Sequence, residues 1–230
     1  MARSTVALIA AALLSAGLIV GGYLLGDGLK RAKFADRAVT VRGLAERDVE
    51  ADLASWTIRF TAQGTSFQGV KGATAAMAED VRAFLTAQGF AAAKITTDSL
   101  SVNQWMMNGM PQVQIRQAVR LDTDDIGGAA RAYAAQGSLL DQGVAIEETR
   151  VVYSFTRLTD LKPDMIAEAT RDARAAAEQF ARDSGATVGA IKSARQGYFS
   201  IEPRDGAVGA ASSSPEQKVR VVTSVDFYLE

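Results

Sequence analysis

Strict alternation of apolar and polar residues is the feature that most constrains the fold of this chain. Within the segment Ala51–Gln63, apolar side chains occupy every second position from Ala54 to Ala62, with polar residues between them. Successive side chains of a β-strand point to opposite faces of a sheet, so the pattern predicts a strand with one buried and one solvated face. The same pattern recurs at 112–121 and 219–229. The chain is therefore predicted to build largely antiparallel sheets, which commonly leave one face open to water.

Three longer segments have the periodicity of helices. The segment Ser66–Gln88 carries one apolar stripe and ends at Gly89, a residue type that favours the left-handed conformation after a helix. A second helix is expected at Asp124–Gln142. A third is expected at Pro163–Ser184, with Pro163 in its first turn and a narrow stripe of small residues along one side. Helices that alternate with pairs of strands indicate an α+β fold.

Shorter stretches complete the predicted order of elements. Further strands are expected at residues 39–42, 95–102, 144–157 and 186–199. Three stretches are predicted as connections: the charged residues 43–52, the hairpin connection 103–111 with its Asn-Gly turn signal, and the flexible loop 201–217.

The N-terminal segment has no charged side chain from Ser4 to Gly26. A helix of this length reaches about 34 Å, enough to cross a hydrocarbon core of about 30 Å. A secretory signal usually has a shorter apolar stretch and ends in a small-residue cleavage site, which the following residues lack. Residues 1–34 are therefore predicted to form an uncleaved transmembrane anchor with a basic juxtamembrane cluster, followed by a body at residues 35–230.

The charges beside this segment carry little information about its orientation. Cytoplasmic flanks of membrane helices have an excess of lysine and arginine. Arg3 and the terminal amine precede the apolar run, whereas Lys30, Arg31 and Lys33 follow it, so the count alone slightly favours a cytoplasmic body. The same cluster also suits contact with anionic lipid head groups.

Composition excludes several kinds of active site. The chain has no histidine and no cysteine, so it cannot hold a Ser-His-Asp triad, a thiolate nucleophile, or a metal site built from those residues. Its formal net charge of −1 lacks the basic excess that favours nucleic acid. Phosphate-binding glycine motifs and a G-x-S-x-G turn are also missing. We expect a protein that is not an enzyme, binds no nucleic acid, and has no catalytic, cofactor-binding or metal-binding residues.

Four large apolar residues gather at the predicted hairpin turn: Trp105, Met106, Met107 and Met110. Thioethers are soft ligands that suit Cu(I). The same cluster also suits a contact with another protein or with lipid, or ordinary packing.

Two groups of acidic residues are further candidates. Asp122, Asp124 and Asp125 offer oxygen atoms that suit Mg²⁺ or Ca²⁺, although helix capping is the simpler interpretation. Glu147 and Glu148 are adjacent on a predicted strand and are expected to point to opposite faces, which makes them a poor acid–base pair. A hydrolase built on carboxylates alone is therefore the least favoured function.

Three stretches carry a resemblance to a known family. They are "VTVRGLAERDVEADLASWTIRF" (39–60), "MIAEATRDARAAAEQFARDSGATVGAI" (165–191) and the closing "VRVVTSVDFYLE" (219–230). The first is similar to a family opening with a V-x-G strand end, a short acidic connection and a long alternating strand. The second is similar to its Ala- and Arg-rich helix that ends in Ser-Gly. Together they resemble the SIMPL-domain family of bacteria, which largely lacks a defined biochemical activity.

This resemblance implies an envelope protein whose body is exported to the periplasm. It also implies large homo-oligomers in some relatives and a loose association with envelope or oxidative stress. We therefore expect a single-pass protein of the bacterial inner membrane, with a SIMPL-like α+β body of mainly antiparallel sheets and three helices in the periplasm. Its expected role is a homo-oligomeric structural or interaction module, with membrane lipids as a further partner. The alternative is a soluble periplasmic protein that binds a small, unidentified ligand after signal cleavage.

Overall fold

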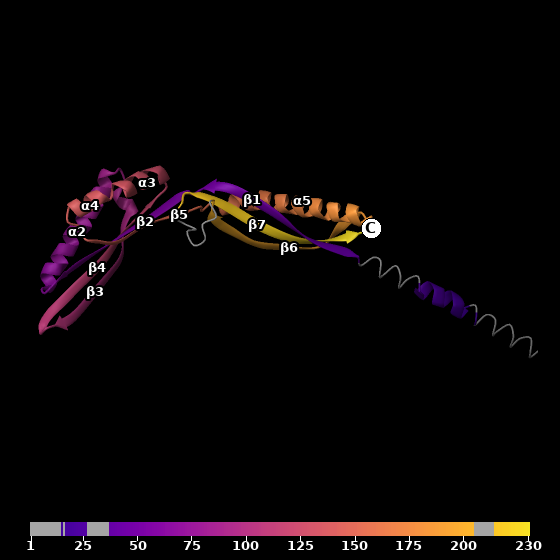
Figure 1. The fold of residues 1–230 in the computed structure, drawn as a ribbon, viewed down its shortest axis with the longest axis horizontal. Helices are drawn as coiled ribbons and strands as arrows, with labels where there is room; N and C mark the ends of the chain where they lie inside the picture. Colours follow the sequence, from indigo (N-terminus) through magenta and orange to yellow (C-terminus); the bar gives the residue numbers. More distant parts are fainter. Residues whose placement is uncertain (1–14, 16, 27–36, 205–213) are drawn as a thin grey trace, which may run out of the picture. The chain divides into compact units, whose positions relative to one another are not determined.

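Two antiparallel sheets with helices packed against them form the body of the protein (Figure 1). The computed structural model describes residues 15, 17–26, 37–204 and 214–230. In chain order the elements are β1 (Ala38–Glu50), β2 (Leu53–Gly64), α2 (Phe67–Ala87), a 3₁₀ turn (Ala92–Lys94), β3 (Ile95–Met107), β4 (Met110–Thr123), α3 (Ile126–Ala135), α4 (Gly137–Asp141), β5 (Ile146–Ser154), α5 (Leu158–Ser184), β6 (Val188–Pro203) and β7 (Glu216–Leu229). The expectation of an α+β body with mainly antiparallel sheets is confirmed.

These elements belong to two compact units. The α2 unit comprises residues 46–163 and 199–220. The α5 unit comprises the described residues up to Ala45, together with 164–198 and 221–230. β1, α5, β6 and β7 therefore each contribute residues to both units.

The α2 unit is built on a four-stranded sheet with the order β3-β4-β2-β5, in which every neighbouring pair is antiparallel. The predicted alternation places Trp56, Ile58 and Phe60 of β2 on one face, where each is buried. The helices α2, α3 and α4 cover this face, with Val81 and Leu85 of α2 in the same apolar cluster (Figure 1). Burial of one such large side chain stabilises the fold by about 1.5–3 kcal/mol.

The boundaries of two predicted helices can be compared with the helices of this unit. The helix expected at Ser66–Gln88 is confirmed as α2, where the Ser66 hydroxyl accepts a hydrogen bond from the Gly69 N–H and Gly89 has φ 97°. The prediction of a single helix at Asp124–Gln142 is wrong, because the segment is divided into α3 and α4 at Gln136. The next residue is a glycine, which has a low helix propensity and weakens the chain at this point.

The second sheet has the order β1-β7-β6. Both pairs are antiparallel. At the start of β1, the Arg37 carbonyl accepts a hydrogen bond from the Leu229 N–H at the end of β7. At the start of β6, Thr187 exchanges two backbone hydrogen bonds with Glu230, which also follows the end of β7. In the α5 unit, α5 packs on this sheet through a stripe of small residues. The buried cluster contains Val39, Ala173, Ala177, Val225 and Phe227.

β1 is much longer than the strand predicted at residues 39–42, and the charged connection predicted at 43–52 is wrong. The strand continues to Glu50, with Glu46, Asp48 and Glu50 on its exposed face. There Glu46 pairs with Lys218 and Arg220, and Asp48 pairs with Arg204. Charged residues are compatible with a strand when partners of opposite charge stand on the neighbouring strand.

Two further boundaries differ from prediction. Helix α5 begins at Leu158, so Pro163 lies inside the helix, where it cannot donate the usual backbone hydrogen bond. The flexible loop predicted at 201–217 is shorter, because β6 runs to Pro203 and β7 starts at Glu216. Residues 205–213 lie outside the described part of the chain.

The predicted anchor lies only partly within the described residues. Residues 17–26 are helical, and Leu18, Ile19 and Tyr23 are exposed. Residues 1–14, residue 16 and the basic cluster at 27–36 lie outside the described part. Among the residues that are described, no helix has both the length and the apolar character needed to cross a membrane.

Candidate functional site

The β3–β4 hairpin carries the largest group of exposed apolar side chains in the α2 unit. We call residues 100–115 the hairpin arm; none of them is charged. Its tip is the two-residue turn Asn108–Gly109, with φ of 52° and 76°, as a type I′ hairpin turn requires. The Asn-Gly turn is confirmed, but the long connection predicted at 103–111 is wrong, because the strands pair up to Met107↔Met110.

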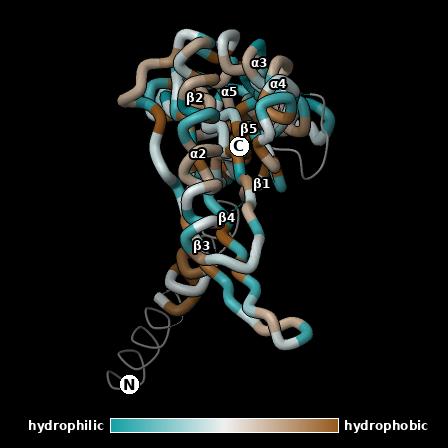
Figure 2. Tube along the Cα trace, turned by 90° about the vertical axis from the view of Figure 1, so that its left-hand side faces the viewer, coloured by the Kyte–Doolittle hydropathy of each residue, from teal (hydrophilic) through white to brown (hydrophobic). Residues whose placement is uncertain are grey.

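Each apolar residue predicted at the turn is exposed. The exposed fractions are 38% for Trp105, 66% for Met106, 49% for Met107 and 55% for Met110. Figure 2 shows the end of the arm reaching beyond the helices of its unit. Exposed apolar side chains that lie near one another are a common feature of surfaces that contact other molecules.

A groove follows the arm toward the core of the unit. It lies between α2, β3 and β4, has a volume of about 260 Å³, and includes Phe67, Leu100 and Val102 in its lining. Leu100 and Val102 are themselves exposed, at 62% and 43%. Neither Leu100 nor Val102 was predicted as a site residue, although the uncharged run from Leu100 to Ile115 was a signal available in the sequence.

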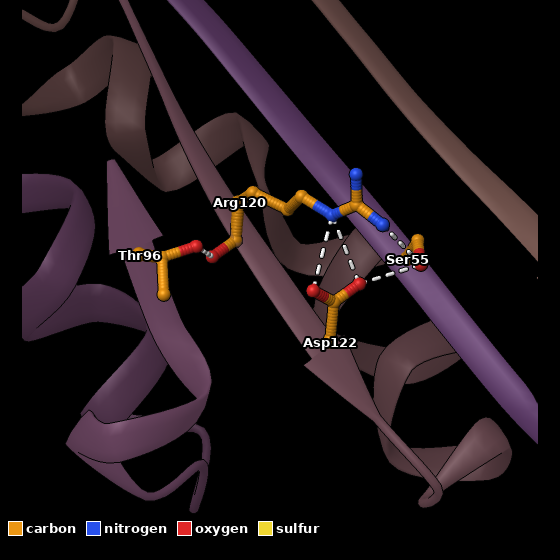
Figure 3. A network of polar contacts seen from close by, with 4 residues as sticks. All are labelled: Ser55, Thr96, Arg120 and Asp122. Atoms are coloured by element: carbon orange, nitrogen blue, oxygen red, sulfur yellow. Dashed lines mark hydrogen bonds and ion pairs between the residues drawn. The ribbon is translucent and has the colours of Figure 1, made fainter. Parts of the chain in front are cut away.

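The opposite face of the four-stranded sheet is polar and holds a network of hydrogen bonds (Figure 3). Arg120 Nε donates to both carboxylate oxygens of Asp122, at 2.9 and 3.1 Å, and the Arg120 Nη2 donates to the Ser55 hydroxyl at 3.1 Å. Ser55 donates in turn to Asp122 at 2.6 Å. An Asp carboxylate already held by a guanidinium is a poor base for a serine nucleophile. The hydrogen bonds of this network tie β2 to β4.

The three aspartates considered for metal binding serve separate structural roles. Asp122 belongs to the network just described. Asp124 forms an ion pair with Lys94, and that hydrogen bond holds the pKa of the Asp124 carboxyl below its usual value. Asp125 caps α3 by accepting a hydrogen bond from the Gly128 N–H at 2.8 Å. The interpretation as helix capping is confirmed for Asp125. Within the described ranges, no group of three or more acidic residues is arranged to hold a metal ion.

Glu147 and Glu148 lie differently from the prediction. A β-bulge between Arg59 and Phe60 inserts Glu147 as an extra residue in β5. Both carboxylates therefore reach the polar face, where Glu148 pairs with Arg59 and Glu147 pairs with Arg116 at 3.1 Å. The expectation that they point to opposite faces is wrong, because the bulge interrupts strict alternation.

A small polar cavity lies beside these ion pairs. Its volume is about 180 Å³. Its lining consists of Thr57, Arg59, Asp98, Glu148 and Arg150. Side chains of both charges thus surround a space large enough for a small polar molecule.

Comparison with known proteins identifies the body. The family described as SIMPL, a protein of unknown function (DUF541), matches residues 39–227. No curated protein matches the chain. Among solved structures, the de novo designed protein Foldit4 is 18% identical and covers 43% of this chain and 94% of its own, with a TM-score of 0.20. A TM-score this low does not support a comparison of the two folds.

Proposed function

Because the chain belongs to the SIMPL family, we propose that it is a membrane-anchored, periplasm-facing envelope protein that acts as a homo-oligomeric interaction module and not as an enzyme. The observation that carries the proposal is the hairpin arm, whose apolar side chains are exposed and whose residues carry no charge. Burial of exposed apolar surface is the main favourable term in protein association. A link to envelope or oxidative stress is an expectation from the family resemblance.

The polar face supports a role without catalysis. Its carboxylates at Asp122, Glu147 and Glu148 each contact an arginine, so none is arranged as a free general base. The hydroxyl of Ser55 has only Asp122 and Arg120 as partners in its network, and the whole chain has no histidine to activate it.

Membrane attachment rests on the N-terminal segment. Ser4–Gly26 has no charged side chain, and its described part, residues 17–26, is helical with apolar side chains exposed. The proposed orientation, with the body in the periplasm, follows the family resemblance against the slight charge bias. A reporter fused after Glu230 that is active only in the periplasm would support this orientation, and activity only in the cytoplasm would contradict it.

The oligomer is tested on the full chain extracted in mild detergent. Sedimentation or light scattering should give a protein mass of several chains. A triple variant, Met106→Ser, Met107→Ser and Met110→Ser, should reduce that mass because it removes apolar surface from the arm. The control is Ile191→Ser, which changes an exposed apolar residue of the α5 unit and should leave the mass unchanged. A wild-type chain that is monomeric at all concentrations would overturn the proposal.

The polar cavity favours the alternative, a soluble periplasmic protein that binds a small charged ligand. N-terminal sequencing separates the two functions, because a mature chain that starts near Ala35 has lost the anchor. Binding is then measured by calorimetry with acetate and with inorganic phosphate, and Arg150→Ala should abolish it if Arg150 in the cavity lining binds the anion. An intact N-terminus with no binding would remove this alternative.

A further inference from the structure

The free edge of β3 has features of a site where another strand pairs. β3 stands at one end of the order β3-β4-β2-β5, and all its residues except Ile95 are exposed. An edge strand presents unpaired N–H and C=O groups along one side, so it is a template for a further strand.

The two edges of this sheet differ in how they are protected. β5, at the other end, has nine residues that include Glu147, Glu148 and Arg150, together with a bulge. Charges and bulges are the usual means of preventing edge pairing. β3 has its only charged residue and its bulge at Asp98, near its start. The stretch Ser99–Met107 therefore has an exposed edge with no charge, no proline and no bulge.

The groove extends this edge as a binding surface. The register with β4 places Leu100, Val102 and Met106 on the side of the sheet that carries α2. The groove lies on this side and is lined by Leu100 and Val102. An extended segment laid along β3 would place every second side chain over the groove, as in strand addition to other sheets.

We propose that this segment is β3 of a second copy, paired antiparallel across a two-fold axis. The occupant must be extended and uncharged, with mainly apolar side chains on the groove side. Ser99–Met107 itself meets these conditions, because Leu100, Val102 and Met106 lie on that side and Gln104 is the one polar residue among them. An antiparallel pair of identical strands is self-complementary, so one surface serves both copies. The inference rests on the proposed function, because it names the interface of the proposed oligomer.

The geometry of such a pair is defined. A two-fold axis perpendicular to the sheet keeps both α2 helices on the same side, so the two grooves open onto one shared apolar surface. With the uncharged stretch centred, Asn103 faces Asn103 of the second copy, and Leu100 faces the second copy's Met106. The two four-stranded sheets then form one sheet of eight strands.

Cysteine crosslinking tests this arrangement, because the chain contains no cysteine and any disulfide formed by one introduced cysteine must join two copies. Single variants Ser99→Cys, Ser101→Cys, Asn103→Cys and Trp105→Cys are made in the full chain in detergent and treated with an oxidant. Residues directly opposite in an antiparallel pair have Cβ atoms about 4.5–5.5 Å apart, close to disulfide range. We expect a maximum of crosslinked dimer at Asn103, and little at the control Val152→Cys on the other edge.

Charges introduced at Asn103 provide the second test. Asn103→Lys and Asn103→Glu each place like charges opposite each other and should weaken association by up to about fivefold, whereas an equimolar mixture of the two should associate at least as well as the wild type. Asn103 is exposed, so both variants should fold, as circular dichroism checks.

The outcomes distinguish this interface from the proposed function. A wild-type oligomer that keeps its mass in both charged variants and gives no β3 crosslink above the control would overturn β3 pairing and leave the oligomer intact. A monomeric wild-type chain would overturn both. If the charged variants lost binding to phosphatidylglycerol vesicles while their oligomer mass stayed unchanged, the arm would contact lipid. This result would also overturn β3 pairing.

Discussion

The two units pack a helix against a sheet in opposite ways. In the α2 unit, large side chains fill the space between helix and strands, and Trp56 meets the edges of Phe84 and Tyr133 at centroid distances of 6.2 and 5.7 Å. In the α5 unit the buried residues of the helix are Met165 and four alanines. One chain can therefore build its cores either by filling space with large side chains or by bringing backbones close together.

Close approach in the α5 unit has a specific origin. A Cβ atom added at Gly43 of β1 would stand 1.8 Å from the Ala169 carbonyl oxygen and 2.5 Å from the Ala173 nitrogen. Only glycine leaves room for the helix backbone at this point. In addition, the Leu44 N–H donates to the Asp172 carboxylate of α5 at 2.9 Å.

The largest effect is expected from emptying the filled core. Phe60→Ala removes a fully buried ring from the α2 unit and should lower the free energy of unfolding by about 3–5 kcal/mol. Chemical denaturation of the full chain in detergent measures this loss. Tyr198→Ala, which removes an aromatic ring that is 99% exposed, is the control and should change little. Equal losses in the two variants would show that the α2 unit does not depend on its filled core.

A slightly smaller effect is expected from preventing the close approach. Gly43→Ala forces α5 away from β1 and should lower the free energy of unfolding by about 3 kcal/mol. The control is Gly72→Ala in α2, where an added Cβ meets no atom within 4 Å. That change should stabilise the helix by about 0.5–1 kcal/mol. If both glycine variants behave alike under denaturation, the two packing modes do not differ as described.

The hydrogen bond between strand and helix should contribute less. Asp172→Ala leaves the Leu44 N–H without its carboxylate partner and should cost about 1 kcal/mol, because water replaces the partner at this exposed position. Hydrogen exchange at the Leu44 amide should become faster. Glu178→Ala, a change at another exposed acid of α5, should leave that exchange rate unaltered.

The smallest expected effect is a dependence of stability on pH that arises from one carboxyl group in the three-stranded sheet. Hydrogen bonds from the hydroxyls of Ser193 and Thr40 hold the pKa of the Asp226 carboxyl below its usual value of 3.8. A group with a lower pKa in the folded state stabilises the fold above its unfolded pKa, and this contribution is lost as the pH falls through the folded value. The wild type should therefore be more stable than Asp226→Asn near neutral pH, and the difference should shrink below about pH 4. A difference that is constant with pH would contradict this origin.

Alternation in the sequence was a reliable guide to the strands with one buried face. β2, β4 and β7 follow it closely, because their inward residues pack against helices and their outward residues meet water. β1 was missed beyond Arg42, since its charges resembled a connection. Their partners Lys218, Arg220 and Arg204 are far along the chain, so the sequence alone did not reveal the pairing.

The candidate site was predictable only in part. Side-chain type and a turn signal were enough to place Trp105 and three methionines at the hairpin turn, but not to decide whether they pack or stay exposed. The groove and the free edge depend on which strands pair, and periodicity does not contain the strand order. The shared face of Glu147 and Glu148 likewise depends on one bulge in β5, which no local pattern announced.

The long separation of β1 and β7 along the chain also determines when this protein can finish folding. Thr40 of β1 donates to Asp226 of β7, 186 residues later in the chain. The strands of the other sheet all lie between Leu53 and Ser154 and can pair as soon as that stretch exists. Contacts of such long range are slow to form. The three-stranded sheet therefore closes last, only after the C-terminal strand has been synthesised, and until then β1 remains without its partner.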